Sequence, residues 1–155
     1  MDRKELYTLA LAQEIRSQRL YSALAQSFKH PANSALFKEL TLLEETHETK
    51  LRQAFGAEFP EVEPDPLQLK EPELAGIDPS DPAQLLQYAI SREEKAQNHY
   101  LAFAADADDE DMKKLLLDLA AEEDNHRSLL LTEQQRILGA VQWFDPSELN
   151  GFMDY

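Results

Sequence analysis

Two short stretches, LLEETHETK at residues 42–50 and AAEEDNHRS at residues 120–128, decide the fold of this 155-residue chain. Each contains a glutamate followed three residues later by a histidine, and leucines surround both at helical spacing. Residues three apart share one face of an α-helix, so each Glu–His pair is predicted to point where its leucines point. In the first stretch the leucines that flank Glu44 and His47 on this face are Leu40, Leu43 and Leu51.

The two stretches belong to a repeat that spans most of the chain. Residues 6–52 align with residues 85–131 at a constant shift of 79, and 12 of the 47 pairs are identical. Leucine and alanine identities are common between any two helices, so the polar identities carry the weight. These are Glu14/Glu93, Gln18/Gln97, Tyr21/Tyr100, Glu44/Glu123 and His47/His126. A repeated helical hairpin implies a pseudo-two-fold axis that relates the two halves of the molecule.

Composition and periodicity predict an all-α four-helix bundle, because strong helix formers dominate and only 4 glycines occur. The helices are expected over about residues 2–29, 33–55, 82–105 and 110–138. The expected N-caps are Asn33 and Asp81, with Pro82 at a first helical position, and Gly56 and Gly139 are expected to end helices.

The spacing of these helices predicts the domain organisation. Short links make two antiparallel hairpins, and a proline-rich acidic stretch between them is too long and too irregular for a helix. That stretch can cross the bundle, as a bundle with one long crossover requires. The predicted parts are hairpin 1 at 2–55, a crossover at 56–81, hairpin 2 at 82–138, a bundle domain at 1–140 and an aromatic C-terminal tail at 141–155.

Charge and cysteine content exclude several classes of function. The chain has 15 Lys+Arg against 30 Asp+Glu, a formal net charge of −15, and no cysteine. This acidity argues against nucleic acid or an anionic membrane as the main partner, and the lack of cysteine excludes disulfides, thiolate metal sites and a thiol nucleophile. No apolar run approaches the roughly 20 residues of a membrane span. We therefore expect a soluble, cytoplasmic protein.

The repeat also predicts a metal site. Glu14 and Glu93 lie on the buried stripes of their helices, so four carboxylates and two imidazoles point at one core. Unpaired buried carboxylates are very unfavourable, and these faces offer no Arg or Lys. Two divalent cations would balance the four glutamates, and neutral histidine ligands suit iron, manganese or zinc better than calcium or magnesium.

This ligand pattern resembles the ferritin-like di-iron carboxylate family, and within it the rubrerythrin-type proteins. There, two helices supply one Glu each and the other two supply a Glu-x-x-His each. The matching segments are LAQEIRSQRLY (11–21), LLEETHETK (42–50), SREEKAQNHY (91–100) and AAEEDNHRS (120–128). The resemblance implies that six residues bind two iron ions and carry the catalysis, with manganese or a mixed pair as alternatives: Glu14, Glu44, His47, Glu93, Glu123 and His126.

The resemblance also implies roles for these residues. Glu44 and Glu123 would bridge the metals, and Glu14 and Glu93 would be terminal ligands. Each histidine would bind one metal. The groups that would support the ligands are Tyr21 and Tyr100, with Gln18 and Gln97 as weaker candidates, although core packing is the simpler role for the tyrosines. His30 and His99 have no glutamate at ligand spacing and are expected on the surface.

The sequence departs from the rubrerythrin pattern in two ways. Rubrerythrins usually carry a rubredoxin-like domain with four cysteines that delivers electrons, and these 155 residues contain none. An external electron donor protein is therefore expected, together with H2O2 or O2 as oxidant and a homodimeric assembly. Rubrerythrins also carry an additional Glu one turn after the ligand of the third helix, where this chain has Ala96, with Ser17 as its counterpart in the first helix.

Three functions remain open on this basis. The first is a rubrerythrin-type oxidoreductase that oxidises its diferrous centre with peroxide or O2, as a peroxidase or ferroxidase in oxidative-stress and iron handling. The second is non-catalytic iron binding, for storage or delivery. The third is a substrate oxygenase or oxidase on the same centre. A metal-free bundle is the structural alternative to all of them, and it predicts that replacing Glu44 and His47 leaves stability unchanged or raised.

Overall fold

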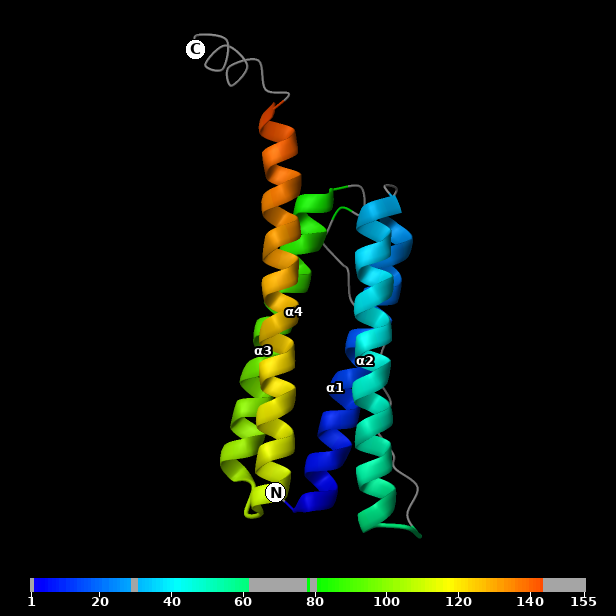
Figure 1. The fold of residues 1–155 in the computed structure, drawn as a ribbon, viewed down its shortest axis with the longest axis vertical. Coiled ribbons are helices and arrows are strands. Elements are labelled where there is room, and N and C mark those ends of the chain that lie inside the picture. Colours follow the sequence, from blue (N-terminus) through cyan, green and yellow to red (C-terminus); the bar gives the residue numbers. More distant parts are fainter. Residues whose placement is uncertain (1, 29–30, 62–77, 79–80, 144–155) are drawn as a thin grey trace.

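Four α-helices account for nearly all of the described chain (Figure 1). The structure, a computed structural model, describes residues 2–28, 31–61, 78 and 81–143, and no strand occurs among them. The helices are α1 (Arg3–Ser27), α2 (Pro31–Glu58), α3 (Pro82–Asp106) and α4 (Glu110–Trp143). The all-α fold expected from composition and periodicity is confirmed.

Two helix starts follow from local hydrogen bonding. Asp2 caps α1: its side chain accepts from the Glu5 backbone N–H at 2.8 Å, while the Glu5 carboxylate accepts from the Asp2 N–H at 3.2 Å. Asp81 caps α3, as predicted, by accepting from Ala83 N–H at 3.0 Å, and Pro82 takes the first helical position. Side-chain oxygens at these positions satisfy N–H groups that have no partner inside the helix.

Three predicted helix boundaries are wrong. Asn33 is not an N-cap, because α2 already begins at Pro31, whose fixed φ and missing N–H suit a first turn. The Asn33 side-chain oxygen instead accepts a 2.8 Å hydrogen bond from Arg136 of α4. Gly56 and Gly139 do not end their helices, which continue to Glu58 and Trp143. Glycine permits a helix to end but does not require it. A Cβ added at either Gly56 or Gly139 would meet no atom within 4 Å, so neither position needs a glycine for reasons of space.

The helices form two hairpins, α1 with α2 and α3 with α4, and most helix–helix contacts lie within a hairpin (Figure 1). Polar contacts tie the hairpins together at both ends. At one end the Arg3 guanidinium pairs with Glu58 of α2 and with Asp109 just before α4. At the other end Arg136 of α4 donates to the Asn33 side chain of α2 at 2.8 Å.

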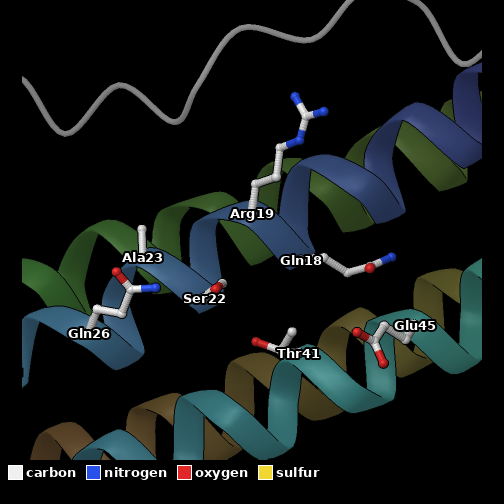
Figure 2. Close-up of a pocket in the computed structure, with 7 residues that line it drawn as sticks. All are labelled: Gln18, Arg19, Ser22, Ala23, Gln26, Thr41 and Glu45. Carbon is white, nitrogen blue, oxygen red and sulfur yellow. The ribbon is translucent and has the colours of Figure 1, made fainter.

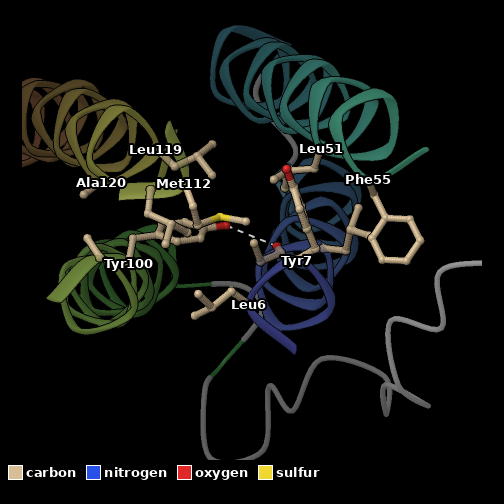
Figure 3. Packing of buried hydrophobic residues seen from close by; sticks show 12 residues of the cluster. Leu6, Tyr7, Leu51, Phe55, Tyr100, Met112, Leu119 and Ala120 are labelled. Atoms are coloured by element: carbon tan, nitrogen blue, oxygen red, sulfur yellow. Dashed lines mark hydrogen bonds between the residues drawn. The ribbon is translucent and has the colours of Figure 1, made fainter. Parts of the chain in front are cut away.

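The bundle interior has three layers. One apolar cluster occupies the end nearest the N-terminus (Figure 3). It contains Leu6, Tyr7, Ala10, Leu11, Leu51, Phe55, Tyr100, Ala104, Met112, Leu116, Leu119 and Ala120. A second apolar cluster occupies the other end, with Leu20, Tyr21, Leu24, Ala25, Phe28, Phe37, Leu40, Leu85, Leu86, Ala89, Ile90 and Leu130. Between the clusters, each of the four helices contributes buried polar residues.

One predicted core position and two predicted segments need comment. Leu43 was expected on the buried face of α2, but its side chain is 36% exposed, since the buried stripe runs through the residue after it. Most of the predicted crossover at 56–81 and the tail from 144 to 155 lie outside the described residues, as does His30. Within residues 2–28, 31–61 and 81–143, no helix is apolar enough over sufficient length to cross a membrane.

Candidate dinuclear metal centre

The structure brings the six predicted ligands together in the polar layer. Each is buried, with an exposed fraction of 5% or less. Glu14 comes from α1, Glu93 from α3, and one Glu–His pair from each of α2 and α4. The two imidazole rings lie nearly parallel, with 5.7 Å between centroids and 9° between planes. This arrangement follows the pseudo-two-fold relation expected from the repeat.

The six residues form two groups of potential metal ligands that share two carboxylates. One group contains Glu14, Glu44, His47 and Glu123, and the other contains Glu44, Glu93, Glu123 and His126. Within each group, one ligand atom from every residue lies within 4.8 Å of all the others. The shared residues are Glu44 and Glu123, so each of these carboxylates would be available to both metals of a bound pair.

The histidines direct one nitrogen into each group. His47 Nδ1 lies 3.3 Å from Glu14 Oε2 and 3.8 Å from Glu44 Oε2. His126 Nδ1 lies 2.7 Å from Glu44 Oε1 and 3.5 Å from Glu123 Oε2. Each Nδ1 therefore faces carboxylate oxygens, and each could act as a neutral ligand to a cation placed between them.

Most of these buried polar atoms make no hydrogen bond, although they lie close together. The atoms concerned are Glu14 Oε2, both oxygens of Glu44 and Glu93, Glu123 Oε2, Nδ1 of both histidines and Nε2 of His126. Native proteins rarely leave so many buried polar atoms unsatisfied in one place. The atoms converge on shared points rather than on one another, and oxygen and imidazole donors suit iron, manganese or zinc. The residues thus fit a pair of divalent metals.

Without metal, the pKa shifts of this cluster favour bound protons. Burial and the neighbouring Glu44 raise the pKa of Glu14 well above its usual range, and burial with Glu93 does the same for the pKa of Glu123. Burial alone would lower the pKa of His126, but the carboxylates around it raise that pKa to about 12. Burial would raise the pKa of Glu44, yet its contacts with Glu14 and His126 hold it well below its usual range. Metal binding must therefore displace protons.

The two predicted tyrosines behave differently. The Tyr100 hydroxyl donates to Glu14 Oε1 at 2.6 Å and contacts the Ala10 carbonyl at 3.2 Å, so it supports a predicted ligand. Burial and the nearby Glu14 raise the Tyr100 pKa well above its usual value, which keeps the hydroxyl protonated and able to donate. Tyr21 is equally buried and stacks on Phe37, but neither oxygen of Glu93 receives a hydrogen bond.

The predicted glutamines do not support the ligands. Gln18 donates to Glu48 Oε1 at 2.8 Å, and among the described residues Gln97 makes no hydrogen bond to the site. Gln18 lines a surface pocket of about 400 Å³ between α1 and α2, and none of the residues that line this pocket is a predicted ligand (Figure 2). The other lining residues are Arg19, Ser22, Ala23, Gln26, Thr41 and Glu45. His99 is exposed, as expected.

Two polar residues at the site were not predicted. Gln13, next to Glu14, is 5% exposed and its Nε2 lies 2.6 Å from Nδ1 of His99, which links α1 to α3. Glu122, next to Glu123, lies 4.0 Å from Nε2 of His47. The helical periodicity of the apolar residues did not predict that Gln13 would be buried. Glu122 stood out only as the second member of a doublet in which the repeat selects Glu123.

Comparison with known proteins agrees with this geometry. The family profile described as Rubrerythrin matches residues 5–75 and 84–148. No curated protein matches the chain. A hypothetical protein from Pyrococcus furiosus is 26% identical, with a TM-score of 0.73 over 90% of this chain and 92% of that one. An uncharacterised conserved protein from Magnetospirillum magnetotacticum MS-1 is 24% identical, with a TM-score of 0.73 over 88% and 95%, and it shows the shared fold.

The profile covers most of both hairpins, and the solved structures share the four-helix fold over nearly their whole length. The family implies a dinuclear metal domain, and the described residues contain two carboxylate–histidine groups able to hold metal. The chain belongs to the rubrerythrin family.

Proposed function

We propose that this protein is a dinuclear-iron oxidoreductase that reduces hydrogen peroxide or O2 with electrons from a separate donor protein. The observation that carries the proposal is the pair of buried ligand groups joined by Glu44 and Glu123. Such sharing supports two metals held as one unit, rather than two independent cations. When bound, the iron pair would supply Lewis acidity and would store the two electrons that peroxide reduction needs.

The chain's own residues supply binding, orientation and exclusion of water. Glu44 and Glu123 would hold both metals, and Glu14 and Glu93 one each. Tyr100 fixes the orientation of Glu14 through its 2.6 Å hydrogen bond. The apolar clusters above and below close the layer, so the reaction would occur away from bulk water. Two electrons and two protons convert one H2O2 into two water molecules, and the electrons must come from outside, because the chain has no cysteine-based redox site.

The experiment that tests this proposal also distinguishes H2O2 from O2 as the oxidant. Ala96 is 5% exposed and offers no ligand where rubrerythrins carry their additional Glu. The metal-free protein should be loaded with Fe²⁺ without oxygen, its iron counted, and each oxidant mixed in by stopped flow while near-ultraviolet absorbance is followed. Two irons per chain with much faster oxidation by H2O2 would support a peroxidase. An equal or faster reaction with O2 would support a ferroxidase.

The matched control for this experiment is Glu44→Gln. Glu44 belongs to both ligand groups, so the variant should lose both irons and the fast absorbance change. Uptake of iron well beyond two per chain would favour storage or delivery instead. If the wild type binds no iron and the variant behaves identically, the metal-centre proposal is wrong.

A further inference from the structure

The repeat breaks down at one position beside the metal centre. The shift of 79 that pairs Glu44 with Glu123 also pairs Leu43 with Glu122, one residue earlier in each helix. The two positions are partly exposed, at 36% for Leu43 and 51% for the Glu122 side chain. A carboxylate therefore stands in one half of the site where the other half has a leucine.

Glu122 faces the outer nitrogen of His47. The Glu122 Oε2 atom lies 4.0 Å from His47 Nε2, whereas His47 Nδ1 points at the ligand carboxylates, 3.3 Å from Glu14 Oε2. A neutral histidine that binds metal through Nδ1 carries its proton on Nε2. The Glu122 side chain is 51% exposed, and a shift of about 1 Å in its carboxylate would bring the oxygen within hydrogen-bond distance of that proton.

His126 has no such acceptor. Its Nδ1 faces Glu44 at 2.7 Å, but its Nε2 is buried and makes no hydrogen bond. The position equivalent to Glu122 is Leu43, whose side chain accepts nothing. A buried N–H without a partner is unfavourable by about 1–3 kcal/mol, and the penalty is incurred whenever His126 is a neutral Nδ1 ligand.

The tyrosines show the same asymmetry independently. Tyr100 donates to Glu14, in the half that contains His47, whereas Glu93, in the half that contains His126, receives no hydrogen bond on either oxygen. In one half of the pseudo-symmetric site, Glu14 receives a hydrogen bond and a carboxylate faces the outer nitrogen of His47, whereas in the other half neither Glu93 nor His126 Nε2 has a hydrogen-bond partner.

We propose that Glu122 is a positioning residue for His47 and that it makes the Glu14/His47 half the tighter of two unequal metal positions. Acceptors on the outer nitrogen of a metal-bound histidine fix the ring and raise its basicity, and losing one typically weakens metal binding by about 10–100-fold. The inference rests on the proposed dinuclear metal site, but not on any redox activity.

Calorimetric titration of the metal-free protein with Co²⁺ tests the proposal, and visible absorption of bound Co²⁺ reports the coordination at each step. The wild type should bind two Co²⁺ in resolvable steps. Glu122→Leu, which places at this position the residue found at its repeat counterpart, removes the acceptor and should weaken the tighter step by about 10–100-fold, leave the weaker step unchanged, and alter the spectrum of the first Co²⁺ only. Leu43→Glu should strengthen the weaker step, and the double variant E122L/L43E should exchange the two.

Glu45→Leu is the matched control, because Glu45 is an exposed acid beside a ligand. It should change both steps slightly and equally. Two identical steps in the wild type would overturn the proposal. So would a Glu122→Leu titration that superimposes on the wild type, or one weakened equally at both steps. Failure of the protein to bind Co²⁺ would overturn this proposal and the metal centre together. Two bound Co²⁺ without any peroxide reaction of the iron form would reject only the redox function.

Discussion

The two apolar clusters and the polar layer between them are built from the same four helices, yet they depend on different partners. Phe55, at 1% exposure, is satisfied by neighbouring side chains such as Tyr7, whose ring lies 5.7 Å away and edge-on. Glu44, at 0% exposure, has no hydrogen-bond partner on either oxygen. The ends of the bundle can therefore form from this chain alone, whereas the middle needs protons or metal.

The largest expected effect is at an end of the bundle. Phe55→Ala removes a ring packed against Tyr7 and Phe59 and should lower the free energy of unfolding by about 3–5 kcal/mol. The loss of stability should be the same with and without bound metal, because the packing of the apolar cluster does not depend on metal. Denaturant unfolding of both forms measures this, with Leu42→Ala, 62% exposed, as a control expected to stay within about 0.5 kcal/mol. A loss that depends on metal would show that the layers are coupled.

The middle layer should respond to pH in the metal-free protein. In the unfolded chain, glutamate carboxyls ionise once the pH exceeds their usual pKa of 4.5. In the folded protein, the raised pKa values of Glu14 and Glu123 keep both carboxyls protonated at that pH. His126, raised from 6.5 to about 12, likewise keeps its proton. The folded state then binds more protons than the unfolded state, so stability falls as pH rises, by about 1.4 kcal/mol per pH unit for each retained proton.

Melting temperatures between about pH 5 and pH 8 check this prediction. Glu44, with its lowered pKa, is ionised in both states over that range and adds no slope. The melting temperature of the metal-free protein should decrease with pH, while the stabilisation given by a fixed Co²⁺ concentration should increase, because protons compete with metal for the same atoms. A flat metal-free profile would mean that the buried carboxylates are already neutralised in another way.

Removing the polar groups should separate the two forms further. The combined change Glu44→Gln and His47→Leu should leave the metal-free protein as stable as the wild type or more stable by about 1–4 kcal/mol, because unsatisfied buried groups are removed. The same variant should lose the stabilisation that metal gives to the wild type. Thermal unfolding with and without Co²⁺ measures both, and Glu45→Gln serves as control. A variant that is destabilised without metal would show that the polar layer is self-sufficient.

The smallest expected effect compares the two tyrosines. Tyr100→Phe loses the hydroxyl that donates to Glu14 and should lower the free energy of unfolding by about 1 kcal/mol. Tyr21→Phe should be nearly neutral, because no hydrogen bond joins Tyr21 to Glu93. Metal titration of the same variants should show a weaker first step for Tyr100→Phe alone. Equal effects of both changes would mean that the two tyrosines play equivalent roles.

The repeat predicted more of the site than of the helix ends. Positions such as Glu44 and His47 are predictable because a buried helical face requires a fixed spacing, and the second copy removes the ambiguity of neighbouring acids. Helix ends at Gly56 and Gly139 were predicted wrongly, because glycine allows termination without enforcing it. Leu43 was predicted on the buried face of α2, but that face is narrow, and the buried residue is the neighbouring Glu44.

The contacts that distinguish the two halves could not be predicted. Whether Tyr21 or Tyr100 reaches a carboxylate depends on small displacements of helices across the bundle, and the sequence treats the two as equivalent. The direction of Glu122 likewise depends on the position of α2 relative to α4. Spacing along one helix determines which residues share a face, but distances between helices are set by packing of the whole core.

The sharing of ligands between hairpins has a kinetic consequence. Each ligand group takes three residues from one hairpin and a single carboxylate from the other: Glu123 completes the group of Glu14, and Glu44 completes that of Glu93. Each hairpin can form early from local contacts, whereas the two dock across a long connection and meet later. Bound metals would then stabilise the docked state of the two hairpins. The dissociation rate of the metals should match the rate at which the hairpins separate, and hydrogen exchange of the α1 and α3 amides would report that rate.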